Sequence, residues 1–96
     1  MYEDLTKNVE NLKGKYISFN GNIESINEGT GYSQLKVTFD GNKNNFIYVK
    51  VSDEKLSHNN LEIGNQLVIK GKIEGEFTFD EETIPALTAE SVEMIN

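Results

Sequence analysis

The residues best suited to ligand chemistry alternate along three stretches that we expect to be neighbouring strands. Rings, lysines, amides and hydroxyls recur at every second position, namely at Tyr16, Ser18, Asn20, Asn22, Lys36, Thr38, Phe46, Tyr48 and Lys50. Alternate side chains of a β-strand lie on the same side of its sheet. Aromatic rings stack on bases and lysines contact phosphates, while rings beside amides and hydroxyls equally suit a sugar or a peptide. The pattern therefore predicts a ligand-binding face; in an alternative interpretation, Phe46 and Tyr48 pack against an N-terminal helix or a neighbouring loop.

A second candidate site is the acidic and aromatic stretch 75–83, which follows the fourth expected strand. Together with the preceding Glu74, the stretch brings five carboxylates and two rings together, at Glu74, Glu76, Phe77, Phe79, Asp80, Glu81 and Glu82. Phosphate would meet like charge in this loop. The two phenylalanines could instead grip a protein partner, or belong to a hairpin that closes over the barrel mouth. Calcium would accept oxygen ligands from Asp80–Glu82, but the spacing matches no EF-hand-type loop, so a solvated acidic run is the favoured interpretation.

Several kinds of chemistry have no support in the sequence. There is no cysteine to ligate a metal as thiolate, and His58, the one histidine, lies in the polar run SHNN, which is typical of a solvated loop. Phosphate-binding glycine motifs are missing. No pair of carboxylates has an apolar setting that would shift a pKa for acid–base work. We therefore predict a protein that is not an enzyme and uses neither a cofactor nor a metal.

Size and charge restrict the class of protein further. The 96 residues suffice for one domain, 1–96, and carry a net charge of −7, with no arginine among the nine basic residues. This charge argues against tight binding to duplex nucleic acid but leaves weak single-strand binding open. No apolar run approaches the roughly 18 residues of a membrane span, and the N-terminus lacks a signal-peptide layout. We expect a soluble chain without membrane insertion; the sequence assigns no oligomeric state.

The periodicity of apolar residues predicts one helix and five strands. Helical spacing of Tyr2, Leu5, Val9 and Leu12 indicates an amphipathic lead-in over 1–14, whose apolar stripe we expect to plug one end of a barrel. Strands are expected near 15–27, 33–40, 46–52, 61–75 and 85–95, with a turn-rich loop over 40–45 and an irregularity near residues 90–91. Inward positions are Ile17, Phe19, Ile23, Leu35, Val37, Phe39, Ile47, Val49, Val51, Leu67, Ile69, Ile73, Leu87, Ala89 and Met94.

Two glycines interrupt the longest strands and favour a closed barrel. Gly21 and Gly71 occupy positions where the alternation would place a core side chain. A glycine inside a strand commonly marks a bend or the close approach of another backbone, and strands must bend to close a small barrel. Three consecutive strands, an insert, and two more strands describe the five-stranded Greek-key barrel called the OB-fold. A barrel of the SH3 type is the competing interpretation.

A family resemblance supports this fold. The stretch YEDLTKNVENLKGKYISFNGNIESINEG resembles the signature of the tRNA_anti-like OB-fold family of Gram-positive bacteria and their phages, in which Y-x-x-L…N…x-K-G-K precedes (V/I)-x-F-x-G-x-(V/I). The later IGNQLVIKGKIEGEFTF and TIPALTAESVE resemble that family's G-D-x-V-x-(I/V)-x-G and (T/I)-x-P-x-(I/L)-x-A segments. The likeness covers nearly the whole chain, although its motifs are structural. Asn65 departs from the family, which often carries an acidic residue there.

The resemblance implies an OB-fold and, through kinship to anticodon-binding domains, nucleic-acid binding. Family members often carry a lipoprotein signal or membrane anchor, which implies an extracytoplasmic place if this chain is excised from such a precursor, and a cytoplasmic one otherwise. Since a fold does not determine a function, three hypotheses follow. The leading one is a module that binds a protein or other extended polymer through the aromatic–lysine face and the acidic loop. The others are single-stranded nucleic-acid binding, with Phe46 and Tyr48 stacking and Lys36 and Lys50 meeting phosphates, and an acidic decoy that mimics nucleic acid.

Overall fold

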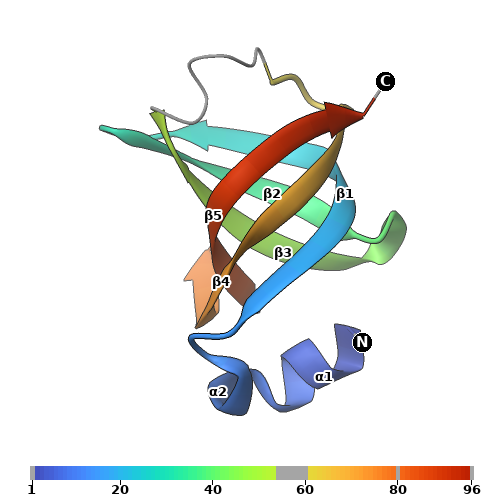
Figure 1. Cartoon of the computed structure of the whole chain (residues 1–96), viewed down its shortest axis with the longest axis vertical. Helices are drawn as coiled ribbons and strands as arrows, with labels where there is room; N and C mark the ends of the chain where they lie inside the picture. The colour runs from blue at the N-terminus through green and yellow to red at the C-terminus, as the bar shows by residue number, and fades with distance from the viewer. Residues whose placement is uncertain (1, 54–60, 80, 96) are drawn as a thin grey trace.

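Five strands follow one another around a barrel in an order that differs from their order in the chain. The computed structural model describes residues 2–53, 61–79 and 81–95, and within these residues the barrel runs β1-β2-β3-β5-β4 and closes between β4 and β1 (Figure 1). The strands are β1 (Tyr16–Glu28), β2 (Tyr32–Phe39), β3 (Asn42–Ser52), β4 (Gln66–Phe79) and β5 (Glu82–Ile95). All pairings are antiparallel except the short parallel contact between β3 and β5. This topology is that of the OB-fold, as predicted.

The long first strand closes the barrel because its two halves have different neighbours. Residues 16–22 pair with β4, whereas residues 23–28 pair with β2, and a register shift between Ile23 and Ser25 separates the two halves. The prediction that mid-strand glycines allow close approach is confirmed. A methyl group at Gly21 would clash with the Thr38 carbonyl oxygen, and one at Gly71 with the Thr88 carbonyl oxygen.

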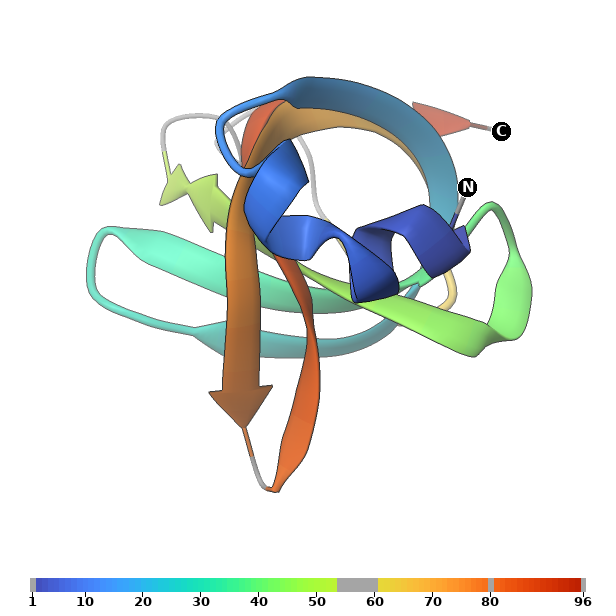
Figure 2. The ribbon, with the colours of Figure 1, turned by 90° about the horizontal axis from the view of Figure 1, so that it is seen from below.

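The N-terminal residues cover one end of the barrel, as the apolar stripe predicted. They form two short helices, α1 (Tyr2–Lys7) and α2 (Val9–Leu12), in place of one. Leu5 and Val9 are buried in the same core cluster as the inward side chains of the strands. Seen from below, both helices lie across the barrel opening (Figure 2). None of the helices in the described ranges is long and apolar enough to cross a membrane.

The predicted core is confirmed except at two positions: Ile17 is only partly buried against the core, and Met94 is exposed. Met94 is 38% exposed, because β5 pairs with β3 only through residues 86–88, so its last residues have β4 as their sole strand neighbour in the described sheet. The predicted irregularity near residues 90–91 is present: Lys70 pairs with Ser91 and Gly71 with Ala89, which leaves Glu90 unpaired. The predicted positions His58 and Asp80 lie outside the described residues.

Two expected loops are shorter than predicted. The loop expected over 40–45 is a two-residue turn at Asp40–Gly41, with positive φ at both residues, followed directly by β3. This is the backbone that joins tight hairpins, and Asp-Gly favours it. The stretch 75–83, expected as a loop or hairpin extension, is the extension: β4 continues to Phe79 and β5 starts at Glu82. We call the part from Glu74 to Ala86 the β4–β5 hairpin.

Candidate ligand-binding groove

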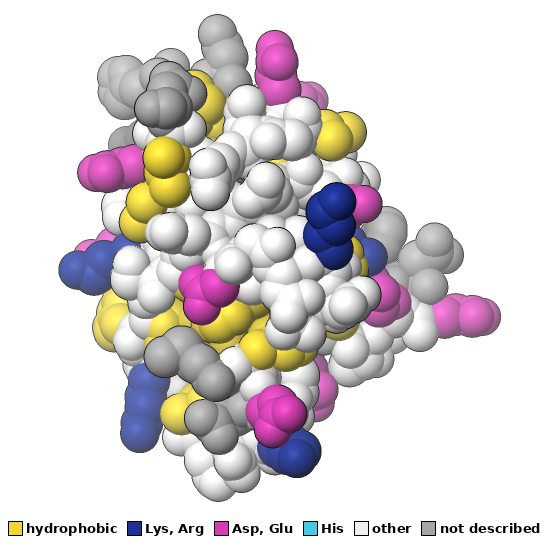
Figure 3. All heavy atoms as spheres, turned by 90° about the vertical axis from the view of Figure 1, so that its right-hand side faces the viewer, with side chains coloured by type: hydrophobic (Ala, Val, Ile, Leu, Met, Phe, Trp, Pro, Cys, Tyr) yellow, Lys and Arg dark blue, Asp and Glu magenta, His cyan; other side chains and the backbone are white. Residues whose placement is uncertain are grey.

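The structure divides the predicted ligand face into two parts. Tyr16, Ser18 and Asn20 are exposed but belong to the half of β1 that pairs with β4. The predicted residues of β2 and β3 pair with one another, Lys36 with Tyr48 and Thr38 with Phe46. The side of the barrel where β1 lies in Figure 1 carries mostly uncharged polar and backbone atoms with a few separated charges (Figure 3). The part built by β2 and β3 therefore holds most of the predicted chemistry.

Two predicted face residues are not available to a ligand. Thr38 is buried, and its Oγ1 accepts a hydrogen bond of 2.9 Å from the backbone N–H of Asn22. This hydrogen bond engages the Thr38 hydroxyl beside the point at which β1 changes its pairing partner from β4 to β2. Tyr48 points away from the barrel interior yet is only 5% exposed, because the Phe77 ring of the β4–β5 hairpin covers it at 5.5 Å, nearly perpendicular. The alternative in which Tyr48 packs against a neighbouring segment is therefore the correct one.

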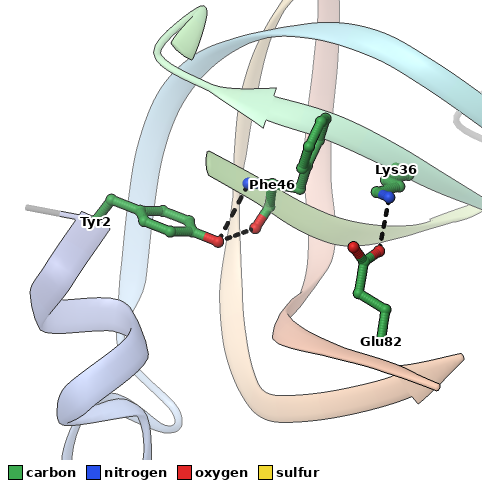
Figure 4. Close-up of polar contacts among 4 residues, drawn as sticks. All are labelled: Tyr2, Lys36, Phe46 and Glu82. Atoms are coloured by element: carbon green, nitrogen blue, oxygen red, sulfur yellow. Dashed lines mark hydrogen bonds and ion pairs between the residues drawn. The ribbon is translucent and has the colours of Figure 1, made fainter. Parts of the chain in front are cut away.

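An ion pair attaches the hairpin to the same face. Lys36 Nζ lies 2.6 Å from Glu82 Oε1 and 4.5 Å from the centroid of the Phe46 ring (Figure 4). The hydrogen bond to Glu82 raises the pKa of Lys36 above its ordinary value, which keeps the ammonium charged. Lys36 therefore holds the hairpin and is already neutralised by a carboxylate.

Phe46 is anchored from the other side by the N-terminal helix. The Tyr2 hydroxyl donates a hydrogen bond of 2.6 Å to the Phe46 carbonyl oxygen and accepts one of 3.1 Å from the Phe46 N–H (Figure 4). Burial raises the pKa of Tyr2 above its ordinary value, so this hydroxyl keeps its proton at neutral pH. Phe46 is half-buried, and its backbone contacts the N-terminal helix, as the alternative interpretation proposed.

Beside the covered Tyr48 lies an open cleft, which we call the aromatic groove. It has a volume of about 300 Å³ and is lined by Tyr32, Gln34, Tyr48, Lys50, Glu74, Phe77, Ala86, Leu87 and Thr88. Tyr32 is 38% exposed and Phe77 is 42% exposed, so both rings offer surface to a ligand. Lys50 Nζ stands 4.6 Å from the centroid of the Tyr32 ring. The groove thus combines three aromatic side chains with one ammonium group.

A local irregularity of β4 builds the far wall of the groove. Ile73 pairs with Leu87 and Gly75 with Ala86, so Glu74 is an extra residue in β4. Gly75 has φ of +116°, a conformation that side chains rarely adopt. Glu74, placed by this bulge, accepts a hydrogen bond of 2.7 Å from Thr88 Oγ1. The bulge therefore orients both the Glu74 carboxylate and the strand that carries Phe77.

Of the predicted site residues, the groove unites Tyr48, Lys50 and Phe77. Glu82 contributes indirectly through Lys36, Glu81 is exposed in the hairpin turn, and Phe79 is the last residue of β4. Glu74, predicted as part of the acidic stretch, also lines the groove, and the sequence prediction missed Tyr32, Gln34 and Thr88. The signal for Tyr32 and Gln34 was the alternation itself, since both precede Lys36 on the same face of β2, but the second strand was expected to begin only at residue 33.

A second hollow lies beyond Lys36 and Tyr48. It has a volume of about 410 Å³, and its lining includes Thr38, Phe46 and Lys43 together with the exposed Ile63. Since Lys36 and Tyr48 are paired across β2 and β3 between the two hollows, the hairpin contacts interrupt what would otherwise be one continuous face. Within the described ranges, no group of three acidic, histidine or cysteine side chains is placed to hold a metal ion.

Comparisons with known proteins agree on the fold. No protein-family model and no curated protein matches the chain. Among solved structures, it is similar to an OBody, AM3L09, bound to hen egg-white lysozyme, with 17% identity over 90% of this chain and 86% of that one and a TM-score of 0.74. It is also similar to Rim1, a mitochondrial single-stranded DNA binding protein of S. cerevisiae, with 14% identity, 86% and 96% coverage and a TM-score of 0.62.

A third similar structure is the Stn1–Ten1 complex of S. pombe. Identity is 25%, the match covers 83% of this chain and 57% of that one, and the TM-score is 0.58. At this level of identity the three likenesses establish an OB-fold and leave the ligand to be argued from the groove.

Proposed function

We propose that this chain is a non-enzymatic OB-fold binding module whose aromatic groove holds an extended segment of a protein partner. The observation that carries the proposal is the groove itself, in which Tyr32 and Phe77 present ring surface beside a single cation and beside the covered Tyr48. Clefts with mostly apolar and aromatic walls and a few placed polar groups are the usual form of a ligand site. Half-exposed aromatic side chains also dominate the energetics of protein interfaces.

The distribution of charge favours a protein over a phosphate chain. Lys50 is the one cation among the described residues that line the groove, and Glu74 stands across from it. Lys36, the next lysine on the face, is engaged by Glu82. Single-stranded nucleic acid is bound by grooves that offer positive charge along the backbone as well as stacking rings. Two carboxylates and a net charge of −7 work against such a ligand.

Single-stranded nucleic acid is the second candidate. Its support is the likeness in fold to Rim1, which is a single-stranded DNA binding protein, together with the resemblance of the sequence to the tRNA_anti-like family. In this case bases would stack on Tyr32 and Phe77, and Lys50 would contact a phosphate. Binding would then weaken steeply as the salt concentration rises. An acidic decoy of nucleic acid has no comparable support, because the aromatic groove would play no part in it.

The two candidates separate in one set of binding experiments. Peptides are selected from a displayed library of random twelve-residue sequences on the wild-type protein, and their affinity and that of oligo-dT are measured by fluorescence anisotropy at low and physiological salt. Phe77→Ala should weaken the selected peptides about tenfold or more, since truncating an interface anchor commonly costs over 1 kcal/mol. Tyr16→Ala is the matched control, because Tyr16 is 60% exposed on β1, outside the groove.

Each result decides something. Peptide binding that depends on Phe77 and not on Tyr16 supports the protein-segment proposal. Suppose that no peptide can be selected, and that oligo-dT binds at low salt in a way that depends on Phe77 and weakens as salt is added. This result would favour single-stranded nucleic-acid binding, the second candidate. If both variants bind like the wild type, the aromatic groove is not the site.

A further inference from the structure

We infer that Gln34 contributes to the selection of the ligand. Its side-chain amide donates a hydrogen bond to a peptide carbonyl oxygen next to an aromatic side chain that the aromatic groove holds. This inference rests on the proposed function and names the chemistry of the segment that the groove takes. It makes Gln34 a specificity-determining residue, which the aromatic rings alone would not require.

The starting observation is a buried polar atom without a partner. Gln34 lines the aromatic groove, and its Nε2 is shielded from solvent with no hydrogen-bond partner among the described residues. Buried polar groups in folded proteins are nearly always hydrogen-bonded, and one that is not calls for an explanation. Leaving a buried donor unsatisfied destabilises the protein.

None of the described neighbours of Gln34 accepts a hydrogen bond from its Nε2. In the barrel register Gln34 lies opposite Asn27 of β1 on one side and Lys50 of β3 on the other. Lys50 offers only donors and stands over the Tyr32 ring. The Glu74 carboxylate has acceptor sites to spare, but the hydrogen bond that it accepts comes from Thr88 Oγ1 and not from Gln34. Since no described residue supplies an acceptor and Gln34 lines the aromatic groove, we assign the acceptor to a ligand that enters the groove.

The size and walls of the groove define that ligand. A volume of about 300 Å³ lies at the lower end of the range for ligand pockets, which suits one large side chain better than a folded surface. The partly exposed rings of Tyr32 and Phe77 favour an aromatic side chain through offset or edge-to-face contacts. In an extended peptide each side chain is flanked by main-chain carbonyls, so one residue can supply both the ring and the acceptor.

Two small probes test the inference directly. N-acetyl-tyrosine methylamide carries both the phenol ring and peptide carbonyls, whereas p-cresol carries the same ring without a carbonyl. Each is titrated into the ¹⁵N-labelled protein, and the amide shifts of residues in the aromatic groove are followed. Gln34→Met keeps the length of the side chain and removes the donor. The matched control is Gln66→Met, the same change at an exposed position of β4.

We expect Gln34→Met to weaken the tyrosine amide about tenfold and to leave p-cresol unchanged, since a lost hydrogen bond to a buried donor has this magnitude. The same variant should raise the Tm by about 4–8 °C, because the unpaired donor no longer destabilises the free protein. Gln66→Met should change neither property. Higher stability together with weaker carbonyl recognition is a combination that a merely structural glutamine would not produce.

A failure of the inference about Gln34 can be distinguished from a failure of the proposed function. If both probes shift the amide signals of the groove but Gln34→Met weakens the binding of both equally, or of neither, the role of Gln34 is overturned. The groove is then still a binding site. A lower Tm for Gln34→Met would show that the amide is satisfied in the free protein, which also overturns the inference. If neither probe shifts the groove amides of the wild type, the proposed function fails along with it.

Discussion

Replacing Gly71 by alanine tests how closely β4 and β5 approach each other. An added methyl group would lie closer than 3.0 Å to the Thr88 carbonyl oxygen, to Cδ2 of Leu87 and to Cα of Ala89. Two of these atoms belong to the β5 backbone, so no change of rotamer relieves the contact and the strands must move apart. Overpacking costs about 1–3 kcal/mol, and we expect the upper end, near 3 kcal/mol. In a domain of this size the Tm would fall by roughly 12–24 °C.

The assay is urea denaturation followed by far-UV circular dichroism, with thermal unfolding as a second measure. Gly31→Ala is the control, because Gly31 has φ of +81° and a methyl group there would meet nothing within 4 Å. Its cost is conformational only, about 1–2 kcal/mol. The two variants therefore separate a steric cost from a backbone cost. If Gly71→Ala destabilises the protein no more than Gly31→Ala, the strands do not approach as closely as the argument requires.

Two further predictions concern the contacts that fix the face of β2 and β3. Tyr2→Phe removes both hydrogen bonds to Phe46 and should cost about 1–2 kcal/mol at neutral pH, measured by urea denaturation. Burial raises the pKa of Tyr2 above its ordinary 10.0, so the contribution of Tyr2 to stability is fully present below pH 10 and is lost as the pH rises through the folded-state pKa. The difference in free energy of unfolding between wild type and Tyr2→Phe should therefore disappear in strong alkali. A difference that does not change with pH would contradict this reasoning. A double-mutant cycle of Lys36→Met and Glu82→Gln should give a coupling free energy of about 0.5–1 kcal/mol, because the pair is only partly shielded from solvent. That coupling should shrink in 1 M salt, and a coupling of zero at low salt would mean that the ion pair does not hold the hairpin.

The fold could be predicted from the sequence because its signals are local. Alternation of apolar residues assigned the inward face of each strand, and a one-residue slip would have turned every such side chain outward. Gly21 and Gly71 marked the two places where strand meets strand too closely for a side chain, which pointed to a closed barrel. The prediction that Met94 belongs to the core failed, because alternation shows on which side of the sheet a side chain lies but not whether a neighbouring strand covers that side chain.

The binding site could be predicted only in part, since it depends on contacts between distant residues. Tyr48 alternates with the exposed Lys50, so the sequence pattern makes both look like ligand contacts, yet Phe77 covers Tyr48 from 29 residues further along the chain. Tyr32 was hidden by its glycine-rich neighbours, which are typical of a turn. Gln34 shares the outward face of β2 with Lys36, but only the packed groove shows that its Nε2 lacks a hydrogen-bond partner among the described residues.

The bulge at Glu74 links the two parts of this molecule, the closed barrel and the open groove. Up to Ile73, β4 follows the barrel, and its backbone also bonds to residues 14 and 15 beside α2. One extra residue and a glycine with φ of +116° then change the register, and β4 and β5 continue together beyond the barrel (Figure 2). A bulge of this kind bends a strand and increases its local twist. Without it, Phe77 would not be held against Tyr48 nor Glu82 against Lys36, and the outer face of β2 and β3 would be an open sheet with no groove.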